Sequence, residues 1–274
     1  MESPRWGLCG NPTYTIYCLL MPVPDPYGLS NAYFEAQIER CRKTLEQIAA
    51  RPDSLRPGRV IPGHDDLRIH DGRRLDASVM FLDICEFSGI PSSNAEEQAS
   101  VLQILSFFFT EMIRIIEDYG GVVEKNTGDG LMAYFADTKT PEISIQTRAV
   151  TAALTMFAAA KTIINPVLAR SGLTPLAFRI CIDHGPITIA KVGAARGFNG
   201  IVAIGTTANI AAKMLAVAGR DTILIGTQVL NGLPQSWLRD FVVHETSETG
   251  WVWRETQEAY DFWRYTARWI FPLK

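Results

Sequence analysis

The chain has 274 residues, of which 47% are hydrophobic and 20% charged, proportions close to those of ordinary globular proteins. This length predicts one large domain, or one domain with extensions, and the composition allows a sizeable core and excludes a disordered tail protein. The 26 Lys and Arg residues against 29 Asp and Glu residues give a net charge of −3, and no basic run is long enough to follow a phosphate backbone. Nucleic acid is therefore not an expected partner.

The N-terminal residues contain no segment that predicts a membrane span or a leader. The longest apolar run there, 16–23, is interrupted by Pro22 and is far shorter than the roughly 20 residues that cross a bilayer. It also lacks the basic start and the cleavage site of a signal peptide. Five cysteines at irregular spacing, without a Cys-x-x-Cys pair, indicate neither a disulfide framework nor a zinc site. We expect a cytoplasmic protein with no membrane partner.

Residues 1–75 are expected to form an extension of one helix, within 31–50, and loops, because Pro and Gly punctuate this part of the chain. Residues 76–274 are expected to form the main domain. There the apolar run 77–82 predicts a buried strand. A helix follows it, with a capping box at Ser93 and Glu96 and apolar residues at helical spacing as far as Gly120.

A hairpin is predicted next, with strands at 121–126 and 131–135 joined through Thr127-Gly128-Asp129-Gly130. A second helix is predicted from Thr140, with Pro141 at its first position, to about Pro166. The order strand, helix, hairpin, helix, strand is the ferredoxin-like βαββαβ plan, an α+β fold. The other predicted elements are strands at 176–182, 187–192 and 222–225, a Gly-spaced connection at 193–205, a third helix at 206–218 and an aromatic C-terminal hairpin over the sheet.

Two aspartates are predicted to converge in this plan. Asp83 ends the first strand and Asp129 lies in the hairpin turn, and the plan places these two strands side by side at the centre of the sheet. Two carboxylates at one sheet edge suit Mg²⁺, which combines one or two carboxylates with substrate phosphates. Taken singly, each aspartate is more simply interpreted as an ordinary turn residue. The pair favours a metal site.

Two further features could bind a nucleotide. The turn Cys85–Gly89 offers backbone N–H groups that can form an anion-binding concavity, and no P-loop motif is present. Asn209 and Lys213 are four residues apart on one face of the third helix, among the small residues Ala208, Ala211 and Ala212, which would permit close approach of another surface or a ligand. A solvated polar stripe is the simpler explanation of such a pair taken by itself.

These features occur together in four segments: VMFLDICEFSGI at 79–90, GGVVEKNTGDGLMAYF at 120–135, ICIDHGPITIAKVG at 180–193 and IVAIGTTANIAAKM at 201–214. Through them the chain from about 75 to 230 resembles the class III nucleotidyl cyclase (adenylate and guanylate cyclase) catalytic domain. The resemblance implies an enzyme that makes a 3′,5′-cyclic nucleotide and pyrophosphate from a nucleoside triphosphate with two divalent metal ions, Mg²⁺ or Mn²⁺. It also implies a homodimer with two shared active sites.

The resemblance also implies a role for each matching position. The metal ligands would be Asp83, Asp129 and the carbonyl of Ile84. The remaining roles would be terminal-phosphate binding by the turn Phe87-Ser88-Gly89, base reading by Lys125, orientation of the ribose by Asn209, and stabilisation of the transition state by Lys213.

Three positions depart from the family pattern. Val202 stands where a base-selecting Asp, Thr or Cys is usual, Lys213 stands in place of an arginine, and Glu86 stands where a glycine is common. A lysine ammonium only donates hydrogen bonds, so Lys125 can satisfy the carbonyl acceptors of uracil, whereas Val202 cannot accept from the amino group of adenine. An unpaired buried donor costs about 1–3 kcal/mol, which disfavours ATP and, more weakly, CTP.

With its N-terminal extension and the hairpin EKNTGDGLMAYF at 124–135, the chain also resembles the pyrimidine cyclases of bacterial Pycsar antiphage defence, which make cyclic UMP or cyclic CMP. This resemblance predicts a uridylate cyclase whose product is sensed by a separate effector protein, with cytidylate or adenylate cyclase as alternatives. A diguanylate cyclase is disfavoured because the hairpin Gly128-Asp129-Gly130-Leu131 lacks paired acidic residues. A degenerate cyclase fold that serves only for dimerisation or sensing is supported by Lys213 alone, since lysine lacks the planar fork of arginine.

Overall fold

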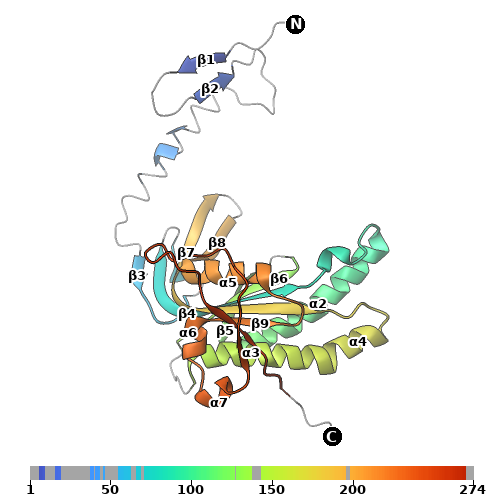
Figure 1. Cartoon of the computed structure of the whole chain (residues 1–274). Coiled ribbons are helices and arrows are strands. Elements are labelled where there is room, and N and C mark those ends of the chain that lie inside the picture. The colour runs from blue at the N-terminus through green and yellow to red at the C-terminus, as the bar shows by residue number, and fades with distance from the viewer. Residues whose placement is uncertain are drawn as a thin grey trace. The chain divides into compact units, whose positions relative to one another are not determined.

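The structure is a computed structural model that describes residues 6–9, 16–19, 38–39, 41–43, 46, 55–62, 66–68, 71–126, 128–137, 143–195 and 198–269. The chain divides into two compact units, residues 1–53 and 54–274. In the first unit, β1 (Trp6–Cys9) pairs antiparallel with β2 (Ile16–Leu19), two strands that were not predicted (Figure 1). The described residues between 38 and 46 are helical, and the other residues of the predicted helix at 31–50 lie outside the described part.

The second unit is built on one mixed sheet in the order β10-β11-β9-β7-β4-β6-β5 (Figure 1). Its central strand β4 (Gly72–Ile84) runs antiparallel to β6 (Gly130–Ala136) and to β7 (Phe178–Ala195). The predicted ferredoxin-like α+β plan is confirmed. The remaining strands are β3 (Leu55–Pro57), which pairs with β4, β5 (Gly121–Asn126), β8 (Phe198–Ile204), which pairs with β7, β9 (Ile223–Gly226), β10 (Val242–His244) and β11 (Phe262–Tyr265).

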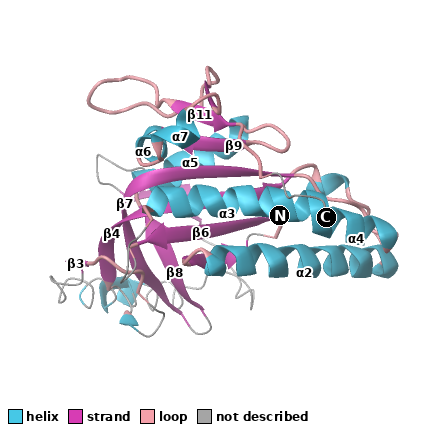
Figure 2. Ribbon diagram, turned by 90° about the horizontal axis from the view of Figure 1, so that it is seen from below, coloured by secondary structure: helices cyan, strands magenta, loops and turns pink. Residues whose placement is uncertain are grey.

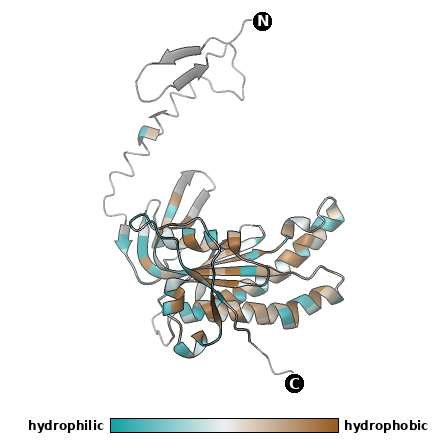
Figure 3. Ribbon diagram, viewed as in Figure 1, coloured by the Kyte–Doolittle hydropathy of each residue, from teal (hydrophilic) through white to brown (hydrophobic). Residues whose placement is uncertain are grey.

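Helices cover both faces of the sheet, and the alternation of side chains along β4 divides the core in two (Figure 2). On one face α2 (Ala95–Asp118) and α3 (Ile145–Ala159) lie side by side and pack against Met80 and Leu82. On the other face α5 (Thr206–Val217) packs in a second core with Val79. Apolar residues accordingly concentrate in the strands and helices that meet in these two cores (Figure 3). By the same alternation Asp83 faces the α5 side. The shorter helices are α4 (Asn165–Arg170), α6 (Thr227–Asn231) and α7 (Gln235–Leu238).

Two helical segments, Ala95–Asp118 and Ile145–Arg170, are long and apolar enough to cross a membrane by length and composition alone. In the structure both pack on the sheet, where 33% and 50% of their most apolar windows are buried. Core helices of folded domains pass the same test, so these two segments are only weak evidence for a membrane span.

The first helix of the main domain starts one residue later than the predicted capping box. Asn94 is the N-cap and accepts a hydrogen bond from the Glu97 backbone N–H at 2.9 Å. The Glu97 carboxylate in turn accepts from the backbone N–H and the hydroxyl of Ser93, at 2.7 and 2.6 Å. Because asparagine is among the strongest N-cap residues, Asn94 and Glu97 take the roles predicted for Ser93 and Glu96.

The predicted bounds of the second helix were also wrong. The helix begins at Ile145, where the Ser144 side chain accepts from the Thr147 N–H at 3.1 Å; Thr140 and Pro141 lie outside the described residues. The helix also continues past Pro166, through a π-helical turn (Ala160–Ile164) into α4. Pro166 lies directly after the π-helical turn, and irregular turns of this kind are common where a proline interrupts the regular hydrogen bonding of a helix.

The strand predictions after this helix require three corrections. The predicted strands at 176–182 and 187–192 form the single strand β7, because pairing with β4 continues through Pro186, opposite Asp76. The predicted connection at 193–205 contains strand β8. The aromatic C-terminus is predicted only in part: Val252 and Ala259 form an antiparallel bridge, and Trp251 and Tyr260 pack in the core under α5, but β11 extends the edge of the sheet by pairing with both β9 and β10.

Candidate active site

The end of the central strand brings the two predicted metal-binding aspartates next to each other. Asp83 lies opposite Gly130 in the β4–β6 register, and the Ile84 N–H donates to the carbonyl oxygen of Asp129 at 2.9 Å. Gly128, with φ at 98°, takes the left-handed position of the turn, and Asp129 does not. Pairing with β4, and not a conformational demand of the turn, therefore places Asp129 beside Asp83.

Arg179 contacts Asp83 and was missed in the sequence analysis. Its Nε and Nη2 donate to Asp83 Oδ2 at 2.9 and 2.7 Å, and its Nη1 donates to the Ala218 carbonyl at 3.0 Å. The two side chains of the ion pair are only 29% and 21% exposed. The available signal was a charged residue inside the apolar strand FRICI at 178–182. Its partner could not be read directly, because Asp83 is 96 residues away.

The donor set at this strand end fits a hard divalent cation. Asp83 and Asp129 supply carboxylate oxygens, and the main chain of Ile84 supplies a carbonyl next to Asp83. The described part of the chain contains no group of three or more His, Cys, Asp or Glu side chains that could hold a metal ion. Two carboxylates without His or Cys suit Mg²⁺ or Mn²⁺, whose shell is completed by water and substrate phosphates, better than zinc.

The predicted phosphate-binding turn is a short 3-10 helix at Phe87–Gly89. The N–H groups of Gly89 and Ile90 donate within this turn, at 2.9 and 3.0 Å. The N–H groups of Phe87 and Ser88 come first in the helix and have no partner inside it, so they are the donors that an anion could use.

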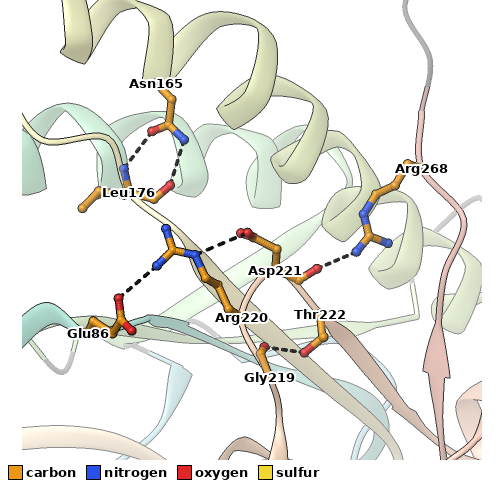
Figure 4. A network of polar contacts seen from close by, with 8 residues as sticks. All are labelled: Glu86, Asn165, Leu176, Gly219, Arg220, Asp221, Thr222 and Arg268. Atoms are coloured by element: carbon orange, nitrogen blue, oxygen red, sulfur yellow. Dashed lines mark hydrogen bonds and ion pairs between the residues drawn. The ribbon is translucent and has the colours of Figure 1, made fainter.

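Glu86 precedes this turn in a left-handed conformation, with φ at 57°. This backbone conformation explains why a glycine suits the position, since glycine adopts positive φ without steric cost. The Glu86 carboxylate accepts from Arg220 Nη1 at 3.0 Å, and Arg220 Nε lies 3.7 Å from the Asp221 carboxylate (Figure 4). An exposed ion pair therefore connects the turn to the loop before β9.

The two predicted base-reading positions are connected through a residue that was not singled out in the sequence, Glu124. The half-exposed Lys125 has its Nζ 3.1 Å from Glu124 Oε1, and the Glu124 side chain is 1% exposed. Glu124 Oε2 accepts from the buried Tyr134 hydroxyl and from the Ala203 N–H, the latter at 2.8 Å. Ala203 follows Val202 in β8. The Glu124 carboxylate therefore contacts Lys125 directly and the residue next to Val202.

Asn209 and Lys213 are both exposed on α5. Ala208 and Ala211, which were expected to permit close approach of another surface or a ligand, pack against the sheet of the same domain, with 6% and 0% of their surface exposed. Within the described residues, no hydrogen bond or ion pair joins Asn209 or Lys213 to either aspartate.

Two cavities lie away from these residues. One of about 480 Å³ is lined by Phe157, Arg220 and Arg268, among others. Another of about 1020 Å³ is lined by Asp183 and Tyr260, among others. Neither is lined by any of the predicted site residues Asp83, Ile84, Asp129, Phe87, Ser88, Gly89, Lys125, Val202, Asn209 and Lys213.

Comparison with known proteins identifies the domain. The family model of the adenylate and guanylate cyclase catalytic domain matches residues 71–257. A uridylate cyclase of Burkholderia cepacia is 29% identical over 218 residues, which cover 78% of this chain and 89% of that protein. The crystal structure of the guanylyl cyclase Cya2 has a TM-score of 0.60 at 20% identity, covering 71% of this chain and 93% of that chain. The adenylyl cyclase CyaB from P. aeruginosa has a TM-score of 0.59 at 22% identity, covering 72% and 96%.

Proposed function

Because the chain belongs to the adenylate and guanylate cyclase catalytic domain family and is a nucleotidyl cyclase, we propose that it converts UTP into 3′,5′-cyclic UMP and pyrophosphate. The proximity of Asp83 and Asp129 at the end of β4, where Asp83 lies opposite Gly130 and the Ile84 N–H donates to the Asp129 carbonyl, is the observation that carries the proposed reaction. The similarity to the Burkholderia cepacia uridylate cyclase supports the choice of base.

The proposed reaction centre uses the oxygen donors at the strand end. Asp83, Asp129 and the Ile84 carbonyl would hold two divalent ions. When bound, these ions would make the ribose 3′-hydroxyl more acidic and neutralise the leaving pyrophosphate. The Phe87 and Ser88 N–H groups would donate to the terminal phosphates. Arg179, already beside Asp83, would supply a fixed positive charge next to them.

Asn209 and Lys213 are proposed to complete the site from a second copy of the chain. Both are exposed on α5. Asn209 would orient the ribose, and the Lys213 ammonium would stabilise the negative charge that grows on the α-phosphate oxygens. A symmetric homodimer would then contain two equivalent sites, each made by both chains.

The proposed base preference rests on Lys125. Its ammonium can donate to a uracil carbonyl, whereas the Val202 side chain cannot accept from a base amino group. Glu124 is an acceptor near this position, but it is 1% exposed, so a base amine cannot reach it without movement of the strand. A buried amine left unpaired costs about 1–3 kcal/mol, or roughly a 10- to 100-fold preference against ATP.

The biological setting is proposed from the sequence resemblance to the Pycsar pyrimidine cyclases. Cyclic UMP would act in the bacterial cytoplasm as a second messenger for a separate effector protein in antiphage defence. Measuring cyclic nucleotides in phage-infected cells that carry the wild-type or the Asp83→Ala gene tests this role. Cyclic UMP is expected to rise only with the wild-type gene, and equal levels in both strains would contradict it.

The activity is tested with the purified chain, UTP and Mn²⁺, by measuring cyclic UMP and pyrophosphate. Asp83→Ala and Asp129→Ala should each abolish both products while the folded state and the oligomeric state are retained. Asp118→Ala is the matched control, because Asp118 is an exposed carboxylate at the far end of α2. Wild-type rates in either active-site variant would contradict the assignment.

A further inference from the structure

Glu124 is a charged residue that lies inside the protein, with 1% of its side chain exposed. Burying a carboxylate is costly unless it is hydrogen-bonded or paired with a positive charge. The contacts of its two oxygens therefore show what the carboxylate holds in place.

The two carboxylate oxygens contact different parts of the domain. Oε2 accepts from the Tyr134 hydroxyl on β6 and from the Ala203 N–H on β8, 79 residues along the chain. Oε1 is buried and accepts no hydrogen bond within the described residues, but it lies 3.1 Å from the Lys125 ammonium nitrogen. One oxygen thus holds β8, and the other is paired electrostatically with Lys125.

A β-bulge makes this arrangement possible. Consecutive residues of a regular strand point to opposite faces of the sheet. The β5–β6 register shifts between Val123 and Lys125, so that Lys125 lies opposite Met132 and Glu124 is the extra residue. Both Met132 and Tyr134, the partner of Glu124, belong to the core under α5. The bulge therefore turns Glu124 and Lys125, neighbours in the chain, towards the same face.

The contact with β8 extends the influence of Glu124 to the second base position. Ile201 and Ala203 pack against the core under α5. Val202 lies between them and, by strand alternation, on the opposite face of β8. A hydrogen bond to the Ala203 N–H therefore sets where β8 presents Val202 relative to Lys125.

We infer that Glu124 is a positioning residue for base selection, which orients the Lys125 ammonium towards a pyrimidine carbonyl and fixes the separation between Lys125 and Val202. This inference rests on the proposed function, because it takes Lys125 as the base reader. Glu124 is hidden and offers the base no acceptor, while the Lys125 ammonium keeps donors besides the one facing Glu124. A base with a carbonyl at this position is then favoured over one with an amine.

The test compares Glu124→Gln with Tyr134→Phe in steady-state kinetics on UTP and on ATP. The glutamine keeps the size of the side chain and an oxygen for the Ala203 N–H, but it loses the charge that faces Lys125. We expect KM for UTP to rise about 10-fold with kcat nearly unchanged, and the ratio of kcat/KM for UTP over ATP to fall about 10-fold. Tyr134→Phe removes a hydrogen bond from Oε2 and leaves the ion pair, so it should lower Tm without changing that ratio.

A double-mutant cycle with Lys125→Met separates positioning from a purely structural role. If Glu124 acts through Lys125, Glu124→Gln should cost nothing further in the Lys125→Met background. Additive losses, or a fall in kcat on both nucleotides with an unchanged UTP-to-ATP ratio, would overturn the inference. If the glutamine variant does not fold, Glu124→Asp is used, which keeps the charge on a shorter side chain and should change KM and the ratio in the same direction by less.

The outcome of this cycle is separable from the proposed function. If the wild-type enzyme cyclises another nucleotide, the uridylate proposal fails, and the cycle is run on that nucleotide. Non-additivity between Glu124 and Lys125 would then still support the positioning role, whereas additivity would contradict it.

Discussion

The Arg179 guanidinium donates two hydrogen bonds to a single carboxylate oxygen of Asp83, at 2.9 and 2.7 Å. Both side chains are less than one third exposed, and charge-assisted bonds of this kind are among the stronger polar interactions in proteins. A divalent ion that binds this oxygen must compete with the guanidinium. Arg179 should therefore lower the affinity of a divalent ion for the proposed metal site at Asp83.

The competition predicts that Arg179→Gln binds Mn²⁺ more tightly than the wild type when no nucleotide is present. We expect an apparent Kd about 10-fold lower, because the loss of charge-assisted hydrogen bonds worth about 1.5–3 kcal/mol frees Asp83. Electron paramagnetic resonance titration of free Mn²⁺ measures this affinity, with Asp83→Ala as the non-binding reference. Equal or weaker binding by Arg179→Gln would show that Arg179 does not oppose the metal.

Lys213 is predicted to act on the transition state. A preorganised charge at this point contributes about 3–4 kcal/mol, so Lys213→Ala should lower kcat about 10²- to 10³-fold with little change in KM. Lys213→Arg should retain most of the activity, since it keeps the charge and adds a planar fork. An unchanged kcat in Lys213→Ala would transfer the role to another cation, for which Arg220, now paired with Glu86, is the candidate.

If two chains build each active site together, as proposed, two inactive variants should complement each other. Mixing Asp83→Ala chains with Lys213→Ala chains should restore activity, because each heterodimer contains one site with all wild-type residues. A statistical mixture of dimers should recover about a quarter of the wild-type rate per chain. The assay is cyclic nucleotide formation after the mixed chains are refolded together. Activity no higher than the sum of the separate variants would contradict a site built from two chains.

A pH-dependent contribution to stability is predicted for Asp183. Its side chain is 2% exposed and accepts from the Tyr260 hydroxyl at 2.5 Å. Burial raises the pKa of Asp183 to about 6, against a smaller opposing effect of this hydrogen bond. Between about pH 4 and pH 6, Asp183 of the folded protein therefore keeps a proton that the same residue of the unfolded chain, with an ordinary pKa of about 3.9, has released. This stabilisation is fully present below about pH 4 and is lost as the pH rises through about 6.

Asp183→Asn should remove this pH dependence. The unfolding free energy of the wild type minus that of the variant should fall by about 2 kcal/mol between pH 4 and pH 7. Urea denaturation at four pH values across this range measures it. Burial lowers the pKa of the adjacent His184, but His184 is present in both proteins, so its effect cancels in the difference. Parallel pH profiles would show that Asp183 does not retain its proton.

The sequence was sufficient to predict the βαββαβ order and the meeting of Asp83 with Asp129, because strand order alone makes them neighbours. It could not reveal Arg179 or Glu124 as site residues, since each is placed by side-chain contacts across 79 to 96 residues of chain. Helix starts were missed locally, where Asn94 replaced Ser93 as the cap. The break predicted at Gly185-Pro186 was wrong because pairing with β4 overrode the local turn signal.

Cyclic UMP is the product that we propose for this cyclase. The most direct measurement incubates the purified protein with ATP, GTP, CTP and UTP at equal concentrations plus Mn²⁺ and identifies the cyclic products by mass. We expect cyclic UMP to predominate, by about one to two orders of magnitude over cyclic AMP. Predominant cyclic AMP, cyclic GMP or cyclic CMP would contradict it.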